Sequence, residues 1–206
     1  ASLAFRIGKT GPQFMVVDAA TRPIAETGLA GSALARKDVI GTPLATLVFD
    51  LVEQACKEVN AELVAEAVAD EFDGGLDRIV LAYWHKDVRD VLTQKLSKYG
   101  VTGIDGATSD RDRADATRDF ARAGGPRVFL AQIEAAGEAI DLSASAVLWV
   151  VEPTFSPRQM RQVSLRITNL NQPRQAFVRA CVLENSIDEA LQAALLRKWT
   201  SIRKVI

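Results

Sequence analysis

The sequence predicts a three-layer α/β sandwich, in which a mainly parallel sheet is covered by helices on both faces. From about residue 44, short apolar segments alternate with longer segments whose apolar residues recur at helical spacing. The short segments are continuously apolar, as in strands that are buried on both faces. Regular alternation of such strands with helices is typical of a parallel sheet. The 206 residues are enough for one domain with a sizeable core.

The first elements of this pattern are a long helix, a strand and a shorter helix. Apolar residues at helical spacing predict a helix over 44–72, which stops at the Asp73-Gly74-Gly75 turn. Residues 78–84 form a short apolar run typical of a buried strand. An amphipathic helix is predicted over 87–99, with Gly100 as its stop.

The middle of the chain repeats the alternation. A strand is predicted over 101–104, followed by a turn at Asp105-Gly106 and a helix over 110–123. The next strand covers 128–131. A short helix or loop over 133–139 follows it.

The last part of the chain adds two strands and two helices. A strand over 146–151 precedes a helix that begins at Ser156-Pro157, with Ser as N-cap and Pro in the first helical position. Residues 176–183 form the final strand. A capping box over 186–189 opens a closing helix that reaches about residue 205.

Residues 1–43 do not continue this pattern, and we interpret them as an arm or linker before a lobe over 44–206. They are rich in Gly, Ala, Thr and Pro, with one possible hairpin around residues 14–18. Gly8-Lys9-Thr10 resembles the end of a phosphate-binding loop. That motif needs a glycine five residues before Gly8, where this chain has Leu3, so no such loop is expected.

Composition bounds the class of protein. Hydrophobic residues make up 48% and charged residues 25%, which is typical of a soluble globular protein, and no apolar run approaches the ~20 residues of a membrane span. Cys56, Cys181 and the lone His85 are isolated, so no structural zinc site is expected and the thiols are expected to be reduced. We therefore expect a cytoplasmic protein, nucleoid-associated if bacterial, with no membrane partner.

Charge is distributed unevenly along the chain. Residues 151–206 hold nine Lys and Arg against four Asp and Glu, whereas the whole chain has a net charge of −1. A basic final quarter is compatible with binding to nucleic acid, and equally with a solvated arginine-rich surface.

Five segments carry a family resemblance. They are residues 83–88, 104–109 with Arg113 and Phe120, 128–144, 151–157 with Gln162 and Arg166, and 184–189. In this order and spacing they resemble the C-terminal helicase lobe of Swi/Snf-type (superfamily 2) DNA helicases and translocases, closest to the annealing-helicase and fork-remodelling branch. The resemblance covers about residues 44–206 and implies a RecA-like fold. It also implies an ATP-dependent motor that acts on double-stranded or forked DNA.

The resemblance implies part of an ATP site. Arg166 would face the γ-phosphate and act in catalysis, where such an arginine can be worth ~10³–10⁵ in rate. Gln162, Gly137 and Glu138 would contact the nucleotide. ATP and Mg²⁺ would be held mainly by an N-terminal RecA-like lobe of the same polypeptide, so this chain alone is expected neither to hydrolyse ATP nor to bind it tightly.

The resemblance also implies DNA contacts from two segments. The residues are Asp105, Gly106, Thr108, Ser109, Arg113, Ala135 and Ala136. Backbone amides and hydroxyls of a turn after a strand can hold a phosphate oxygen. An ordinary turn that caps the next helix explains Thr108 and Ser109 equally well, and a lone arginine such as Arg113 is often only a surface residue. A compact strand-to-helix loop is the alternative for residues 135–137.

Several positions depart from the family pattern. Asn169 stands at the second arginine of the final motif, and Asn171 stands at the following glycine. Ala139 replaces a glycine, and Asp141 places a carboxylate where a polyanion would approach. Asparagine cannot supply the charge of an arginine. The alternative function is therefore a catalytically degenerate lobe that acts as a DNA- or protein-binding module.

A small-molecule enzyme is the least supported function. The chain has no dinucleotide glycine fingerprint and no nucleophile paired with its single histidine. For His85, at the end of a strand, a structural or polar-contact role is favoured over that of a switch.

Overall fold

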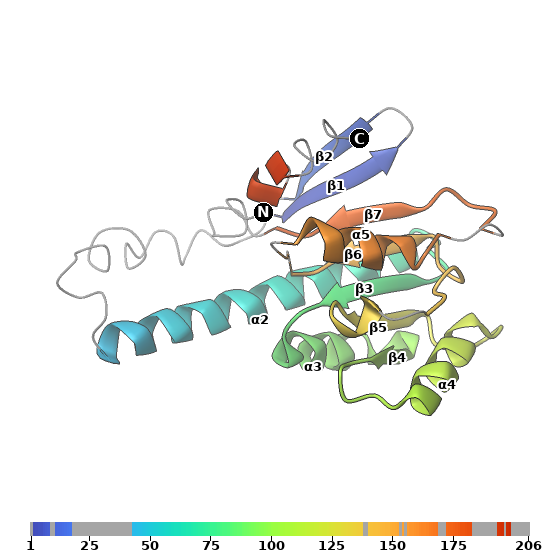
Figure 1. Ribbon diagram of the computed structural model, residues 1–206, viewed down its shortest axis with the longest axis horizontal. Coiled ribbons are helices and arrows are strands. Elements are labelled where there is room, and N and C mark those ends of the chain that lie inside the picture. The colour runs from blue at the N-terminus through green and yellow to red at the C-terminus, as the bar shows by residue number, and fades with distance from the viewer. Residues whose placement is uncertain are drawn as a thin grey trace.

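The computed structural model describes residues 2–8, 11–17, 43–137, 140–152, 154, 156–168, 172–182, 193–195, 197 and 198. Its centre is a parallel sheet with helices on both faces (Figure 1). This arrangement confirms the α/β sandwich predicted from the sequence.

Five strands form the sheet, in the spatial order β4-β5-β3-β6-β7. The strands are β3 (Ile79–Tyr83), β4 (Val101–Ile104), β5 (Val128–Gln132), β6 (Val147–Val150) and β7 (Phe177–Ala180). Every neighbouring pair in this sheet is parallel. The carboxyl ends of all five strands therefore lie at one edge of the sheet, called the carboxyl edge below.

The connections between the strands are helical. They are α3 (Lys86–Lys95) with the short 3₁₀ helix η2 (Ser97–Tyr99), α4 (Asp110–Ala121), the 3₁₀ turn η3 (Ala135–Gly137), and α5 (Pro157–Leu165). The long helix α2 (Pro43–Asp73) precedes the first strand of the sheet.

Each face of the sheet has its own hydrophobic core. Side chains alternate along a strand, so Val80 and Ala82 of β3 face one side whereas Leu81 and Tyr83 face the other. Helices α4 and α5, with η3, pack on the first side, and α2 and α3 pack on the second. Both faces are buried, which explains why the strand segments are continuously apolar.

Helix α2 is much longer than the strands it covers. Its buried residues recur at helical spacing: Ala61, Val64, Ala65, Val68 and Phe72. A helix of 31 residues is ~46 Å long, about three times the length of β3. The first part of α2 therefore extends past the carboxyl edge (Figure 1).

Two of the predicted elements are clearly shorter in the structure, whereas the others shift by one or two residues at their ends. The helix expected over 87–99 is broken, because α3 ends at Lys95 and Leu96 leads into η2. Gly100 follows with a φ of 71°, a conformation that other residues rarely adopt. The strand expected over 176–183 is shorter, since Cys181 and Val182 lie beyond the end of β7.

The two ends of the chain are described in part. Strands β1 (Ser2–Gly8) and β2 (Gly11–Val17) form an antiparallel hairpin beside β7 (Figure 1). Gly8 pairs with Gly11 at its tip, while Lys9 and Thr10 lie outside the described residues. The capping box expected over 186–189 also lies outside them. Within the described residues, no helix combines the length and hydropathy of a membrane-crossing segment.

Candidate functional site

The carboxyl edge contains a topological switch at β3. The connection after β3 runs through α3 on the face that α2 covers. The connections after its neighbours β5 and β6 run through η3 and α5 on the opposite face. Ligands of open parallel sheets bind where connections diverge in this way. Of the residues predicted to bind DNA or nucleotide, those in the loops directly after β4 and β5 lie at this edge where the structure describes them. Gln162 lies in the second half of α5, the helix after β6, and Arg166 follows its end.

Asp105, directly after β4, organises the first of these loops. Its Oδ1 accepts hydrogen bonds from the amide of Ala107 at 2.9 Å and the hydroxyl of Thr108 at 3.0 Å. Arg89 of α3 donates to Oδ2 at 3.0 Å. The hydrogen bond from the Ala107 amide is the main reason why the pKa of Asp105 is lowered. Asp105 is thus an ionised residue that closes a turn.

The hydroxyls of Thr108 and Ser109 both serve the turn and the helix after it. Thr108 Oγ1 accepts from the Asp105 amide at 2.9 Å. Ser109 is the N-cap of α4, since its Oγ accepts from the Asp112 amide at 3.2 Å and donates to the Asp112 carboxylate at 2.7 Å. These contacts match the turn-and-cap alternative that the sequence left open.

Gln132, at the end of β5, connects three loops of this edge. Its Oε1 accepts from the Gly106 amide at 2.8 Å, and its Nε2 donates to the Trp84 carbonyl at 3.3 Å. The loops after β3, β4 and β5 are therefore tied together by one side chain.

Two arginines hold the turn at residues 135–137. Arg113 of α4 donates from Nη1 to the Ala135 carbonyl at 2.8 Å. Arg166, just after α5, donates from Nε to the Ala136 carbonyl at 3.0 Å, and its own carbonyl accepts from the Leu142 amide at 2.8 Å. Ala135 and Ala136 are buried, so this turn can present only backbone atoms to a ligand. The structure thus joins three predicted segments at one place.

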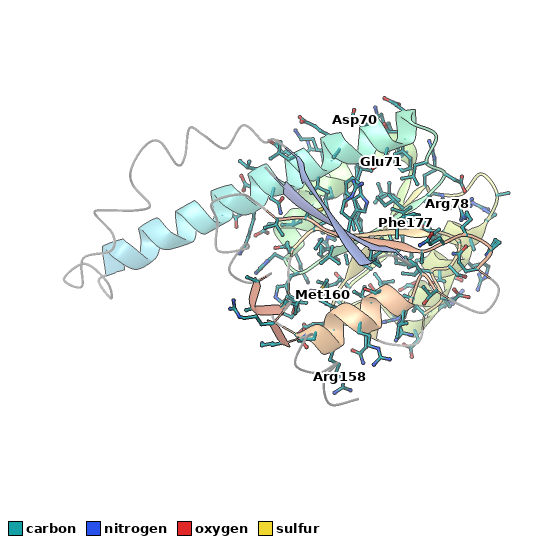
Figure 2. All side chains as sticks on the ribbon, turned by 90° about the horizontal axis from the view of Figure 1, so that it is seen from above. Asp70, Glu71, Arg78, Arg158, Met160 and Phe177 are labelled. Carbon is teal, nitrogen blue, oxygen red and sulfur yellow. The ribbon has the colours of Figure 1, made fainter. Side chains whose placement is uncertain are left out.

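Helix α5 has a buried face and a basic exposed face. Its N-cap is Ser156, as the sequence predicts. Met160 points toward the sheet, whereas Arg158 projects away from the domain (Figure 2). Gln162 is half-buried and lies one helical turn before Arg166.

Sequence reasoning missed the partner of His85. Glu152 follows β6, and its carboxylate Oε2 accepts from the amides of Trp84 at 2.7 Å and His85 at 2.8 Å. Its Oε1 lies 2.5 Å from His85 Nδ1. A carboxylate directly after one buried strand and a histidine directly after another were visible in the sequence. Their pairing depends on β3 and β6 being neighbours, which the sequence does not reveal.

Most ion-paired cations of the described residues lie away from the carboxyl edge, and Arg89 of α3, paired with Asp90 and Asp105, is an exception. Within the described residues, Arg78, Lys95, Arg118 and Arg122, which lie before a strand or toward the end of a helix, form ion pairs. Another set, also within the described part, forms no ion pair or hydrogen bond and is exposed: Lys86, Arg111, Arg158 and Arg161. Each of these four exposed cations lies in the first half of a helix that follows a strand, so the four gather at the carboxyl edge.

The unpaired cations differ in how many carboxylates lie near them in the sequence, and therefore in how well they can attract an anion. Between Asp105 and Asp119 the chain has five carboxylates and three cations, whereas 156–168 has three arginines and no carboxylate. Cations near a helix N-terminus oppose the helix dipole, so helix stability does not explain Arg158. The side of the edge formed by α5 is therefore the more basic one.

Some predicted positions lie outside the described residues, namely Glu138, Ala139, Asn169 and Asn171. Asp141 is exposed, and its Oδ1 accepts from the Ser143 amide at 2.9 Å. In the described part of the chain, no group of three His, Cys, Asp or Glu side chains is placed to hold a metal ion.

Comparison with known proteins gives a family and a fold. A family model described as the helicase conserved C-terminal domain matches residues 61–171. The chain of the C-terminal part of the Fun30 ATPase domain superposes with a TM-score of 0.58 at 20% identity, covering 66% of this chain and 43% of that one. This similarity confirms the RecA-like fold.

Two curated relatives have similar sequences. DNA repair protein RAD5A of Arabidopsis thaliana is 25% identical over 142 residues, which is 66% of this chain and 14% of that protein. The human helicase-like transcription factor is 25% identical over 97 residues, 46% of this chain and 10% of that protein. The chain thus spans a small part of either relative.

Proposed function

The chain belongs to the family of helicase conserved C-terminal domains, of the Swi/Snf-like type, and we propose that it is one lobe of an ATP-dependent DNA translocase. One observation carries the proposal most directly. Three segments far apart in the sequence, containing Arg113, the turn at 135–137 and Arg166, meet at the turn that follows the carboxyl end of β5. This is where a RecA-like lobe binds ligands.

The proposed nucleotide site is a partial one. Gln162 and Arg166 offer an amide and a guanidinium, which suit a phosphate or a base edge. We propose that ATP and Mg²⁺ are held mainly by an N-terminal lobe, and that Arg166 reaches the γ-phosphate across the cleft when the two lobes close. The arginine then stabilises the charge that develops on the transferred phosphoryl group.

The proposed DNA partner is a duplex or a fork, bound through its phosphates. The unpaired cations at the carboxyl edge supply positive charge, and the backbone of the turn at 135–137 supplies further contacts. Phosphate contacts carry no sequence information, so binding would be independent of sequence and strongly dependent on salt. We propose that the protein is cytoplasmic and binds DNA there.

A second candidate function is a catalytically degenerate lobe that binds DNA or protein. Arg166 already donates to the Ala136 carbonyl, and Asn169 replaces the second arginine of the motif. An arginine that only holds the turn would leave the lobe as a binding module.

The two functions are separated by nucleotide turnover. The measurement is DNA-stimulated ATP hydrolysis by a protein that carries this lobe together with its N-terminal lobe. Under the translocase proposal, hydrolysis is present, and Asn169→Arg raises it by restoring positive charge at the cleft. If hydrolysis is absent and Asn169→Arg does not restore it, the binding-module function is the correct one.

A further inference from the structure

His85 and Glu152 form a pair at the topological switch, between the ends of β3 and β6. We propose that the protonated ring of His85 donates from Nε2 to a phosphate oxygen, and that Glu152 is the positioning residue that accepts from Nδ1 and holds the ring in this orientation. The phosphate belongs either to a DNA backbone or to a nucleotide. The choice between these sources rests on the proposed function, whereas the tautomer and the affinity for phosphate do not.

The hydrogen bonds around Glu152 determine the position of the imidazole proton. Oε2 accepts from the amides of Trp84 and His85, and Oε1 lies 2.5 Å from His85 Nδ1. An ionised carboxylate has no proton to donate, so Nδ1 must carry the proton of this contact. A carboxylate on one ring nitrogen fixes the role of the other. Nε2 is consequently an acceptor in the neutral ring, and it donates to a ligand when the ring is protonated.

Exposure leaves that nitrogen accessible. The side chain of Glu152 is 10% exposed, whereas that of His85 is 41% exposed. Within the described part of the chain, Nδ1 is the ring atom of His85 for which a contact is found. The buried carboxylate thus holds the ring from inside while Nε2 remains accessible from solvent.

The negative charge of Glu152 repels a phosphate less than the charge of an unpaired carboxylate would. Three N–H groups donate to it, two from the backbone and one from the ring. Together with the imidazolium, Glu152 forms a pair with no net charge. An approaching phosphate stabilises the imidazolium, which then donates from Nε2 in a charge-assisted hydrogen bond. The adjacent Lys86, exposed and without an ion pair in the described residues, adds positive charge.

The first test reads the tautomer directly. His85 is the single histidine in the chain, so nitrogen-labelled histidine gives one unambiguous set of imidazole NMR signals. The expected spectrum of the neutral ring has the proton on Nδ1, and Glu152→Ala abolishes this preference. Glu152→Gln is a second variant that keeps an acceptor oxygen. Asp70→Asn, which removes an exposed carboxylate from the far end of α2, is the matched control and leaves the signals unchanged. A neutral ring that carries its proton on Nε2 and not on Nδ1 in the unmodified chain would overturn the proposal.

The second test adds phosphate in three forms to the labelled chain: inorganic phosphate, ATP, and a DNA duplex of about 20 base pairs. A shift at Nε2 supports the proposal, and comparison of the duplex with ATP identifies the source. His85→Ala should weaken binding of the responding ligand about 5- to 10-fold. In a chain that already carries Glu152→Ala, adding His85→Ala should weaken binding of this ligand only slightly further. If none of the three probes moves the Nε2 signal, the proposal is wrong. A response to phosphate in a protein that hydrolyses no ATP would retain this site and reject the translocase function.

Discussion

Two arginines reach the same short turn from different helices, and the backbone of the candidate site depends on them. Arg113 and Arg166 donate to consecutive carbonyls, those of Ala135 and Ala136. Removing the donor of a partly buried carbonyl destabilises a protein by more than the average net contribution of a hydrogen bond, because the carbonyl is left without a partner. Their side chains therefore fix the backbone that a ligand would contact.

Replacing Arg113 should destabilise the chain. Arg113→Ala removes the donor to the Ala135 carbonyl and is expected to lower the free energy of unfolding by about 1–2 kcal/mol. Urea denaturation measures the change. Arg111→Ala is the matched control, because Arg111 is exposed and without hydrogen bonds in the described residues, and it should stay within about 0.5 kcal/mol of the original. Equal losses in the two variants would contradict the role of Arg113.

Two buried groups predict how stability changes in alkali. Burial raises the pKa of Tyr83 from 10.0 to about 12, and it raises the pKa of the Cys181 thiol from 9.0 to about 12. Both groups hold their protons more tightly in the folded chain than in the unfolded one. Their contribution to stability is complete below about pH 9 and is lost as the pH rises toward about 12.

The contribution of Tyr83 can be isolated by mutation. The urea midpoint should fall between about pH 9 and about pH 12, and Tyr83→Phe should make the fall shallower because it removes one of the two buried groups whose pKa is raised. The same pH dependence in the original chain and in Tyr83→Phe would show that Tyr83 does not contribute.

At the scale of elements, the spacing of apolar residues in the sequence predicted which segments form helices and strands. The strands and the helices over 44–72, 110–123 and from Ser156 are present with small shifts at their ends. The break at Leu96 was missed, because the apolar spacing continues through it. The order of the strands in the sheet also could not be predicted from the apolar pattern along the chain. Contacts between neighbouring loops, such as Glu152 with His85 and Gln132 with Gly106, therefore appear only in the structure.

Strand β4 approaches β5 closely at Gly103. A Cβ at this position would lie 2.2 Å from the Leu130 carbonyl oxygen. Gly103→Ala should therefore destabilise the chain by about 1–3 kcal/mol or separate β4 from β5. Gly106→Ala is the control for stability, since its Cβ would lie 3.6 Å from Gln132 Oε1, an ordinary contact. Thermal unfolding compares the two, and a stable Gly103→Ala variant would show that the register of β4 and β5 is wrong.

Helix α5 should contribute to DNA binding through charge. The double change Arg158→Glu and Arg161→Glu should weaken binding to a duplex and reduce the slope of log affinity against log salt by about two. Fluorescence anisotropy at several salt concentrations measures both. The control is Arg118→Glu with Arg122→Glu, which makes the same change in net charge at the end of α4, where both arginines are in ion pairs. If the control weakens binding as much as the α5 change, binding depends on total charge and not on this surface.

At the scale of the whole molecule, the fold separates stability from the candidate site. Two hydrophobic cores hold the sheet from both faces, and most of the paired cations lie toward one end of its strands. At the other end, side chains from neighbouring connections hold the loops in place, and exposed cations without ion pairs in the described residues gather there. A pre-organised, basic edge suits a lobe whose partner supplies the remaining groups of an ATP site.

The role of Arg166 tests the central claim most directly. The measurement is the DNA-stimulated rate of ATP hydrolysis by the two-lobe protein, compared between the original and Arg166→Ala, with nucleotide affinity measured separately. The proposed function predicts that kcat falls by ~10³ or more while ATP still binds, because the arginine acts on the transition state. A variant that retains its kcat would contradict the assignment of Arg166 to the ATP site and leave it as a structural contact of the turn at 135–137.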